Sequence, residues 1–172
     1  DSTIIGQECL DELADLAGVG AQVADLTARA MAGEIDFAEA LRQRVDMLAG
    51  VSVELLQRTF DERVALNPGA RTLVKTMAAN GAITALVSGG FQFFTSRVAD
   101  TAGFGSFDGN MFEIEDSVLT GKITGDIVGA KAKQTTLESL MAEHDIPTEL
   151  TLAVGDGAND IPMLKAAGLG VA

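Results

Sequence analysis

The chain has 172 residues, which is the length of one ordinary domain and is enough to bury a hydrophobic core. Its 12 Lys and Arg stand against 25 Asp and Glu, and the formal net charge of −13 argues against binding of nucleic acid through the phosphate backbone. A single cysteine, Cys9, and a single histidine, His144, exclude an intramolecular disulfide framework and are too few for a Cys/His zinc cluster.

Two features of the sequence indicate where in the cell the protein is located. The N-terminus is acidic and lacks the apolar run of a signal peptide. The longest charge-free stretch, 76–96, is interrupted by polar and small residues such as Asn80, Gly81 and Ser88, so it predicts a helix end, a buried strand and a loop rather than a membrane span. We therefore expect a soluble, cytoplasmic protein without a membrane partner.

The first half of the chain is predicted to be helical from about residue 8 to residue 79. Apolar residues recur at helical spacing over 10–17, 23–31, 37–49, 52–64 and 70–79. Asp36 and Ser52 stand where a side chain can cap the third and fourth of these helices. Asn67-Pro68-Gly69 predicts a break before the fifth helix.

Beyond residue 80, strands and helices alternate. Strands are predicted over 82–87, 150–154 and 168–172, helices from near residue 92, over 131–144 and over 159–167, and a hairpin around Asp116 and Ser117. This alternation predicts an α/β fold with a mostly parallel sheet, into which the helical segment is inserted as a cap. We expect residues 1–7 and 69–172 to form the core and residues 8–68 to form the cap.

Three short motifs lie where α/β folds place ligand sites, beyond the carboxyl ends of strands. They are Asp1-Ser2-Thr3, Ser88-Gly89-Gly90-Phe91 and Gly155-Asp156-Gly157-Ala158-Asn159-Asp160. In the third, glycines permit a tight turn, while Asp156 and Asp160 offer the hard carboxylate oxygens that magnesium prefers. A turn followed by a helix cap is the alternative interpretation of this motif. Lys133, which stands between the second and third motifs, would by itself be interpreted as a solvated surface lysine.

These motifs and several cap segments resemble the haloacid dehalogenase (HAD) superfamily and, within it, the bacterial phosphoserine phosphatases. The resemblance covers essentially the whole chain and rests on QECLDEL (7–13), RAMAGEIDF (29–37), LRQRV (41–45), VSGGF (87–91) and VGDGAND (154–160). It implies a HAD-like Rossmannoid parallel-sheet core with an inserted α-helical cap and a small β-hairpin. It also implies a Mg²⁺-dependent hydrolase that converts O-phospho-L-serine to L-serine and phosphate through an aspartyl-phosphate intermediate, the last step of serine biosynthesis.

The same resemblance implies roles for individual residues. Asp1 matches the aspartate that protonates the leaving serine oxygen and later deprotonates the attacking water, and its backbone carbonyl reaches the metal. Asp156 matches the metal-binding carboxylate, Asp160 a residue that supports it, and Lys133 the lysine that neutralises phosphoryl charge. The substrate would be held at its phosphate by Ser88, the Gly89 amide and Asn159, at its ammonium by Glu8, at its carboxylate by Arg44, and along its apolar flank by Met31 and Phe37.

Alternatives remain at the level of residues and of function. Taken alone, Glu8 is interpreted as a helix N-terminal acid, Arg44 as a surface ion-pair partner, and Met31 and Phe37 as core residues. The family's nucleophilic aspartate stands two positions before Asp1, outside the printed sequence together with its strand. We therefore expect a polypeptide that starts at Asp1 to be insoluble or inactive. A phosphatase or phosphotransferase for another small phosphomonoester stays open, as does an inactive module that binds phosphoserine, and a homodimer stays open beside a monomer.

Overall fold

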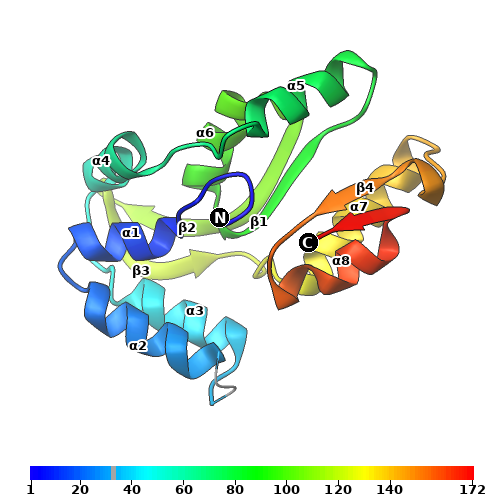
Figure 1. Ribbon diagram of the computed structural model, residues 1–172. Coiled ribbons are helices and arrows are strands. Elements are labelled where there is room, and N and C mark those ends of the chain that lie inside the picture. The colour runs from blue at the N-terminus through cyan, green and yellow to red at the C-terminus, as the bar shows by residue number, and fades with distance from the viewer. Residues whose placement is uncertain (32–33) are drawn as a thin grey trace.

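The computed structural model describes residues 1–31 and 34–172, except for the side chain of Met31. Four helices make up the first part of the chain (Figure 1): α1 (Cys9–Leu16), α2 (Gly20–Met31), α3 (Phe37–Asp46) and α4 (Val53–Arg63). The predicted caps are confirmed, because Asp36 accepts a hydrogen bond from the backbone N–H of Ala38 at 2.9 Å and Ser52 accepts one from that of Leu55 at 3.3 Å. Helix α3 ends three residues earlier than expected, since the chain tightens into short turns before Gly50, which adopts a φ of +82°.

The connections into and out of this helical segment lie side by side. Ile5 and Leu66 form an isolated antiparallel bridge. The backbone N–H of Asn67 donates to the Ile4 carbonyl, and the Asn67 side chain donates to the Thr3 carbonyl, each at 2.9 Å. Such a paired crossing suits a cap inserted into a core, although the boundaries at residues 8 and 68 stay a prediction.

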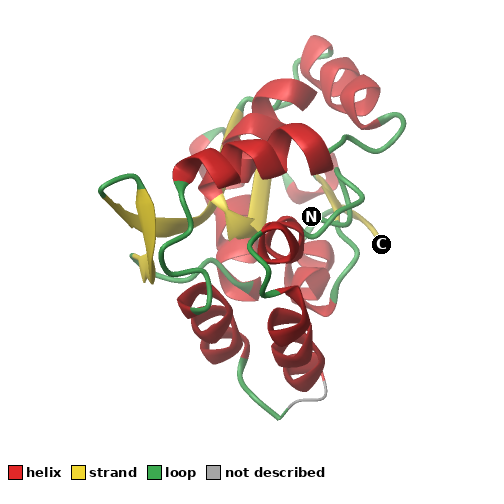
Figure 2. Ribbon diagram, turned by 90° about the vertical axis from the view of Figure 1, so that its left-hand side faces the viewer, coloured by secondary structure: helices red, strands yellow, loops and turns green. Residues whose placement is uncertain are grey.

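The rest of the chain alternates between helices and strands as predicted. The elements are α5 (Ala70–Ala79), β1 (Ala85–Phe91), α6 (Gln92–Ala102), β2 (Ser106–Glu115), β3 (Val118–Thr124), α7 (Ala130–Glu143), a 3₁₀ turn (Thr148–Leu150), β4 (Leu152–Val154), a second 3₁₀ turn (Ala158–Asp160), α8 (Ile161–Ala166) and β5 (Leu169–Val171). The β2–β3 hairpin turns at Asp116 and Ser117, whose φ angles of 48° and 64° are those of a tight hairpin turn. It extends at the left-hand edge of Figure 2.

The predicted α/β fold is confirmed, and within the described residues its strands form two sheets. One sheet has the order β1-β2-β3, with β1 and β2 parallel and β2 and β3 antiparallel, and the other consists of the parallel pair β4-β5. Within the described residues, β1 and β4 share no ladder hydrogen bonds, so each leaves one edge unpaired. Local patterns in the sequence do not report which strands pair, so the pairing is known only from the structure.

The boundaries of β1 also differ from the prediction. Residues 82–84 lie outside the strand, and Ser88–Gly90, expected to form a loop, lie within it. The pairing with β2 explains the difference, because Val87 pairs with Asp108 and the next pair is Phe91 with Asn110. The glycine-rich segment therefore bulges from the ladder without ending it.

The hydrophobic core joins the helical segment to the strands. Leu13, Val45 and Leu48 from the helices are fully buried in one cluster with Phe91 and Leu119 from the strands. The hairpin is attached to this cluster by the backbone, since Gly50 N–H donates to the Leu119 carbonyl and Leu119 N–H donates to the Val51 carbonyl, both at 2.8 Å. Among the described helices, none is long and apolar enough to span a membrane.

Candidate active site

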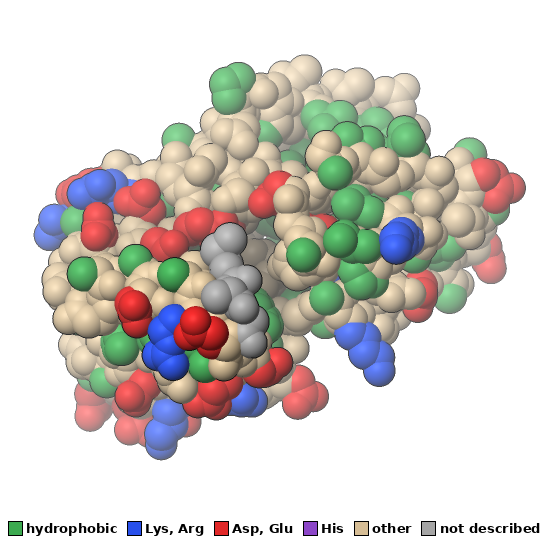
Figure 3. Space-filling view, turned by 60° about the horizontal axis from the view of Figure 1, so that its bottom comes forward, with side chains coloured by type: hydrophobic (Ala, Val, Ile, Leu, Met, Phe, Trp, Pro, Cys, Tyr) green, Lys and Arg blue, Asp and Glu red, His purple; other side chains and the backbone are tan. Residues whose placement is uncertain are grey.

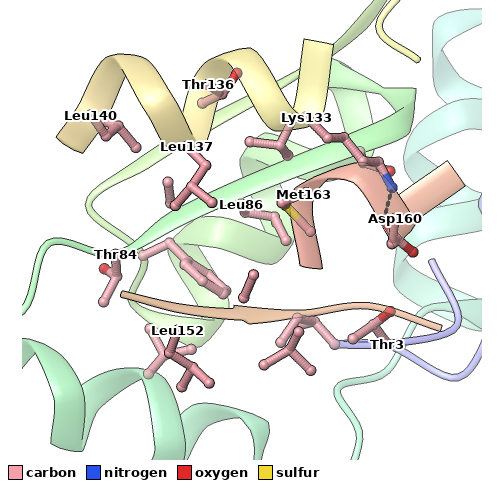
Figure 4. A pocket seen from close by; sticks show the side chains of 18 of the residues that line it. Thr3, Thr84, Leu86, Lys133, Thr136, Leu137, Leu140, Leu152, Asp160 and Met163 are labelled. Atoms are coloured by element: carbon pink, nitrogen blue, oxygen red, sulfur yellow. Dashed lines mark hydrogen bonds and ion pairs between the residues drawn. The ribbon is translucent and has the colours of Figure 1, made fainter. Parts of the chain in front are cut away.

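A cavity of about 820 Å³ opens between the helical segment and the strands, and residues from all three motifs line it. The predicted site residues that it brings together are Asp1, Glu8, Phe37, Arg44, Ser88, Gly89, Lys133, Asp156, Asn159 and Asp160. The side chain of Met31 lies outside the described residues, so its predicted role is not placed. Figure 4 shows the inner part of the cavity, where α7 with Lys133, Leu137 and Leu140 lies across from Leu152 of β4.

The N-terminal motif packs against the other two motifs. Asp1 Oδ1 accepts a hydrogen bond from the backbone N–H of Cys9 at 3.3 Å. A Cβ placed on Gly90 would lie 2.7 Å from Asp1 Oδ2, so only glycine permits the carboxylate to approach the second motif so closely. Thr3 Oγ1 donates a hydrogen bond to Asp156 Oδ1 and thereby ties the first motif to the third.

The second motif presents a buried hydroxyl at the β1 bulge. Ser88 is 8% exposed, and its Oγ accepts a hydrogen bond from the backbone N–H of Gly90 at 2.9 Å. Because that acceptor position is used within the turn, the hydroxyl proton of Ser88 remains available to donate. This is the chemistry that an anionic ligand oxygen requires.

The third motif is organised around Asp160, which is 4% exposed. Its Oδ2 accepts hydrogen bonds from the backbone N–H groups of Asp156 at 3.2 Å and Gly157 at 3.0 Å. Its Oδ1 lies 2.6 Å from Nζ of Lys133, which is 8% exposed and therefore not a solvated surface lysine. Burial by itself would raise the pKa of Asp160, but the hydrogen bonds from Lys133 and the loop amides, with the lysine charge, hold it below its usual value.

The helical segment contributes charges of both signs. Glu8 is exposed at the start of α1, where Ser2 Oγ donates a hydrogen bond to it. Arg44 is half-buried on α3, and its Nη1 donates to Thr27 Oγ1 of α2 at 3.3 Å. Arg44 is therefore not in the surface ion pair that its position alone suggested. Phe37 lies 41% exposed at the cavity, rather than in the core.

Asp11 is a charged neighbour of Arg44 that the sequence analysis missed. Among the described residues, Arg44 Nε and Asp11 Oδ1 are buried without a hydrogen-bond partner. Burial lowers the pKa of the Arg44 guanidinium, an effect that the charges of Asp11 and Glu8 oppose. The signal for Asp11 was its spacing, because a residue three positions after Glu8 lies on the same helical face. Thr27 was also missed, since its contact with Arg44 joins two different helices and leaves no local pattern in the sequence.

The carboxylates at the cavity suit magnesium better than zinc. Among the described residues, no three or more His, Cys, Asp or Glu side chains cluster as metal ligands. Asp1 and Asp156 nevertheless both face the cavity, and Mg²⁺ is typically bound through one or two carboxylates together with water and phosphate oxygens. The donor set therefore fits a magnesium ion shared with a phosphorylated ligand.

The family follows from comparison with known proteins. The family model of haloacid dehalogenase-like hydrolases matches residues 1–165, and the chain belongs to this family. A solved HAD family hydrolase from Salmonella enterica serovar Typhi superposes with a TM-score of 0.94 and 41% identity, covering 100% of this chain and 59% of that one.

The relatives within the family carry one activity in their names. The chain is 46% identical to the phosphoserine phosphatase of Idiomarina loihiensis, over 100% of this chain and 78% of that relative. It is also 46% identical to the phosphoserine phosphatase of Archaeoglobus fulgidus, over 100% of this chain and 50% of that relative. A structure of a substrate-bound phosphoserine phosphatase matches with a TM-score of 0.89 and 36% identity, over 98% of this chain and 80% of that one. The chain thus spans between half and four-fifths of the length of these relatives.

Proposed function

We propose that the protein is a magnesium-dependent phosphoserine phosphatase. The observation that carries the proposal is the charge pattern of one cavity. Glu8 and Arg44 line it from the helical segment, and Ser88 of β1, Lys133 of α7 and Asp156 of the third motif line it from the rest of the chain. A phosphorylated amino acid has the complementary pattern, with an ammonium and a carboxylate at one end and a phosphate at the other. The relatives named as phosphoserine phosphatases support the same substrate.

The carboxylate and the ammonium of the substrate would be recognised by opposite charges. The planar guanidinium of Arg44 can pair with a carboxylate through two parallel hydrogen bonds, and Thr27 already orients one of its nitrogens. Glu8 would accept hydrogen bonds from the substrate ammonium. The exposed ring of Phe37 would cover the short apolar stem between these groups and the phosphate.

The phosphate would be bound by Ser88, the Gly89 amide, Asn159 and Lys133. A magnesium ion held by Asp156 and the Asp1 carbonyl, with Asp160 in support, would offset the phosphoryl charge as it develops. In this proposal an aspartate carboxylate two positions before Asp1 forms a bond to phosphorus while the bond from phosphorus to the serine oxygen breaks. Asp1 gives its proton to that leaving oxygen, and it takes a proton from the water that then releases inorganic phosphate.

Two unpaired strand edges support the proposed position of the strand that carries this nucleophile. Within the described residues, β1 pairs with β2 alone and β4 with β5 alone, and residues of both β1 and β4 line the same cavity. Apolar residues, among them Leu86, Leu137 and Met163, line this inner part (Figure 4). We propose that an apolar strand preceding Asp1 pairs with both edges and completes one parallel sheet.

We also propose that the protein is located in the cytoplasm. The one cysteine of the chain, Cys9, is buried and free, which fits a reducing compartment such as the cytoplasm. A homodimer stays open beside a monomer.

The direct test is release of inorganic phosphate by the full-length gene product in the presence of Mg²⁺. Phosphoserine is compared with p-nitrophenyl phosphate and with small phosphomonoesters that lack an amino-acid end. We expect kcat/KM to be highest for phosphoserine. Preference for another phosphomonoester would replace the substrate assignment, and tight phosphoserine binding without phosphate release would favour an inactive binding module.

A further inference from the structure

Asn110 connects the second motif to the segment that precedes Lys133. It lies on β2 and is 1% exposed. Its Nδ2 donates a hydrogen bond to the Gly89 carbonyl at 2.8 Å, and its Oδ1 accepts one from the backbone N–H of Val128 at 2.9 Å. One side chain therefore joins three segments that are distant in sequence.

The contact with Gly89 replaces a ladder hydrogen bond that the β1 bulge removes. Between the pairs Val87–Asp108 and Phe91–Asn110, β1 advances four residues while β2 advances two. Ser88–Gly90 are therefore out of register with β2, and the Asn110 amide supplies a hydrogen-bond donor to the Gly89 carbonyl at this point.

The peptide unit between Gly89 and Gly90 is held on both sides. Its carbonyl accepts from Asn110, and its N–H, which points the opposite way in a trans peptide, donates to Ser88 Oγ. The plane of this one peptide sets the direction of the Ser88 hydroxyl. Asn110 thus acts on the hydroxyl through the backbone without touching the cavity itself.

The other end of Asn110 reaches the start of α7. Val128 precedes Gly129, whose carbonyl accepts a hydrogen bond from the backbone N–H of Lys133 at 3.1 Å. A Cβ on Gly89 would lie 3.6 Å from the Val128 carbonyl oxygen, so the two segments are already in contact. Asn110 thus bonds to the segment that carries Ser88 and to the segment that leads to Lys133.

We propose that Asn110 is a positioning residue. It holds the Ser88 hydroxyl and the Lys133 ammonium at the relative positions in which both can bind one phosphoryl group. The proposal rests on the proposed function only in that a phosphoryl group is the ligand, and inorganic phosphate alone can test it. Asn110 forms no part of the cavity lining, so it does not contact the ligand directly.

The test is the full-length protein with Asn110→Asp, which keeps the oxygen that accepts from Val128 and places an acceptor against the Gly89 carbonyl. Asn110→Ala removes both bonds without this repulsion. We expect both variants to bind inorganic phosphate at least about tenfold more weakly by calorimetry, with kcat lowered more than KM is raised for any phosphomonoester that the wild type hydrolyses. The aspartate variant should be the weaker binder of the two.

The matched control is Thr59→Val, which removes another buried side-chain hydrogen bond, from Thr59 Oγ1 to the Leu55 carbonyl, at a position away from the cavity. It should lower the melting temperature and leave phosphate affinity unchanged. Phosphate affinity within about twofold of the wild type in both Asn110 variants would overturn the proposal and leave Asn110 a purely structural residue.

A measurement on the wild-type protein tests the proposal even if the Asn110 variants fail to fold. In NMR spectra, the side-chain amide resonances of Asn110 should shift when phosphate is titrated. Resonances that do not shift would also overturn the proposal. Failure of the wild type to hydrolyse phosphoserine would contradict the proposed function without affecting either readout.

Discussion

Lys133 and Asp160 form an ion pair with 2.6 Å between Nζ and Oδ1, and both side chains are more than nine-tenths buried. The same carboxylate accepts two backbone hydrogen bonds from the Asp156–Gly157 turn. Asp160 therefore orients the lysine and shapes the loop that carries Asp156, the carboxylate that we propose binds the metal. The same ion pair therefore contributes to the stability of this part of the fold and positions the side chains that we propose bind the phosphate and the metal.

Replacing Lys133 by methionine should destabilise the full-length protein by about 3–5 kcal/mol, because it leaves the buried Asp160 carboxylate without its partner. Urea unfolding measures the change. Lys131→Met, at an exposed lysine of the same helix, is the control and should change stability by less than about 0.5 kcal/mol. Combining Lys133→Met with Asp160→Asn should recover part of the loss, whereas strictly additive effects would mean that the two side chains are not coupled.

Asp156→Asn should abolish turnover at ordinary Mg²⁺ concentrations while the melting temperature changes little, because Asp156 is exposed and its side chain is placed to bind the metal. Phosphate release and Mg²⁺ binding by calorimetry measure the two effects. Asp145→Asn, at an exposed aspartate outside the cavity lining, should retain both. Undiminished activity of the wild type in EDTA would contradict the metal requirement.

Arg44→Ala should lose about 2–5 kcal/mol of transition-state stabilisation for phosphoserine, the range for removing one partner of a buried charge pair. Hydrolysis of p-nitrophenyl phosphate should fall much less, because that substrate has no carboxylate. The ratio of the two kcat/KM values is the measurement, and Arg42→Ala, at an exposed arginine of α3, is the control. Equal losses on both substrates would assign Arg44 to the fold or to the phosphate.

Cys9 should make the protein less stable as the pH rises above about 8.5, where the thiol of an unfolded chain begins to ionise. Burial raises the pKa of the Cys9 thiol to about 12. Between these values the native state keeps a proton that the unfolded state loses, so stability falls by up to about 1.4 kcal/mol per pH unit.

The measurement for Cys9 is urea unfolding at pH 8 and at pH 10, compared between the wild type and Cys9→Ala. The pH dependence of the wild type should exceed that of the variant. Native Cys9, which is 2% exposed, should also resist thiol reagents at pH 8 and react on unfolding. Rapid modification of the native protein would show that the thiol is more accessible than its burial indicates.

A polypeptide limited to residues 1–172 should aggregate or lack activity, because the facing edges of β1 and β4 are unpaired and the inner cavity is apolar. Figure 3 shows hydrophobic side chains gathered on the surface of the right-hand lobe. Leu150, Ile161 and Leu169 are large hydrophobic residues that are exposed in the structure. Sedimentation and phosphate release, each compared with the full-length gene product, measure the two outcomes. Robust phosphoserine hydrolysis by residues 1–172 alone would mean that the nucleophile has been misplaced.

Local signals in the sequence determined most of the helices and the composition of the site. The caps at Asp36 and Ser52 were predictable because a cap side chain bonds to a backbone N–H only two or three residues away. The turn of the β2–β3 hairpin was predictable for the same reason. Together with Lys133, the three motifs and the cap segments identified ten of the residues that line the cavity, since each motif is a short, continuous run.

Tertiary structure alone decided the environments of these residues. The burial of Lys133 depends on Asp160, 27 residues later, and the orientation of Arg44 depends on Thr27, 17 residues earlier. The extent of β1 depends on its register with β2, and the role that we infer for Asn110 depends on Gly89 and Val128. None of these contacts leaves a local pattern, because the partners meet only after the chain has closed long loops, and burial then sets the strength of every charge and hydrogen bond between them.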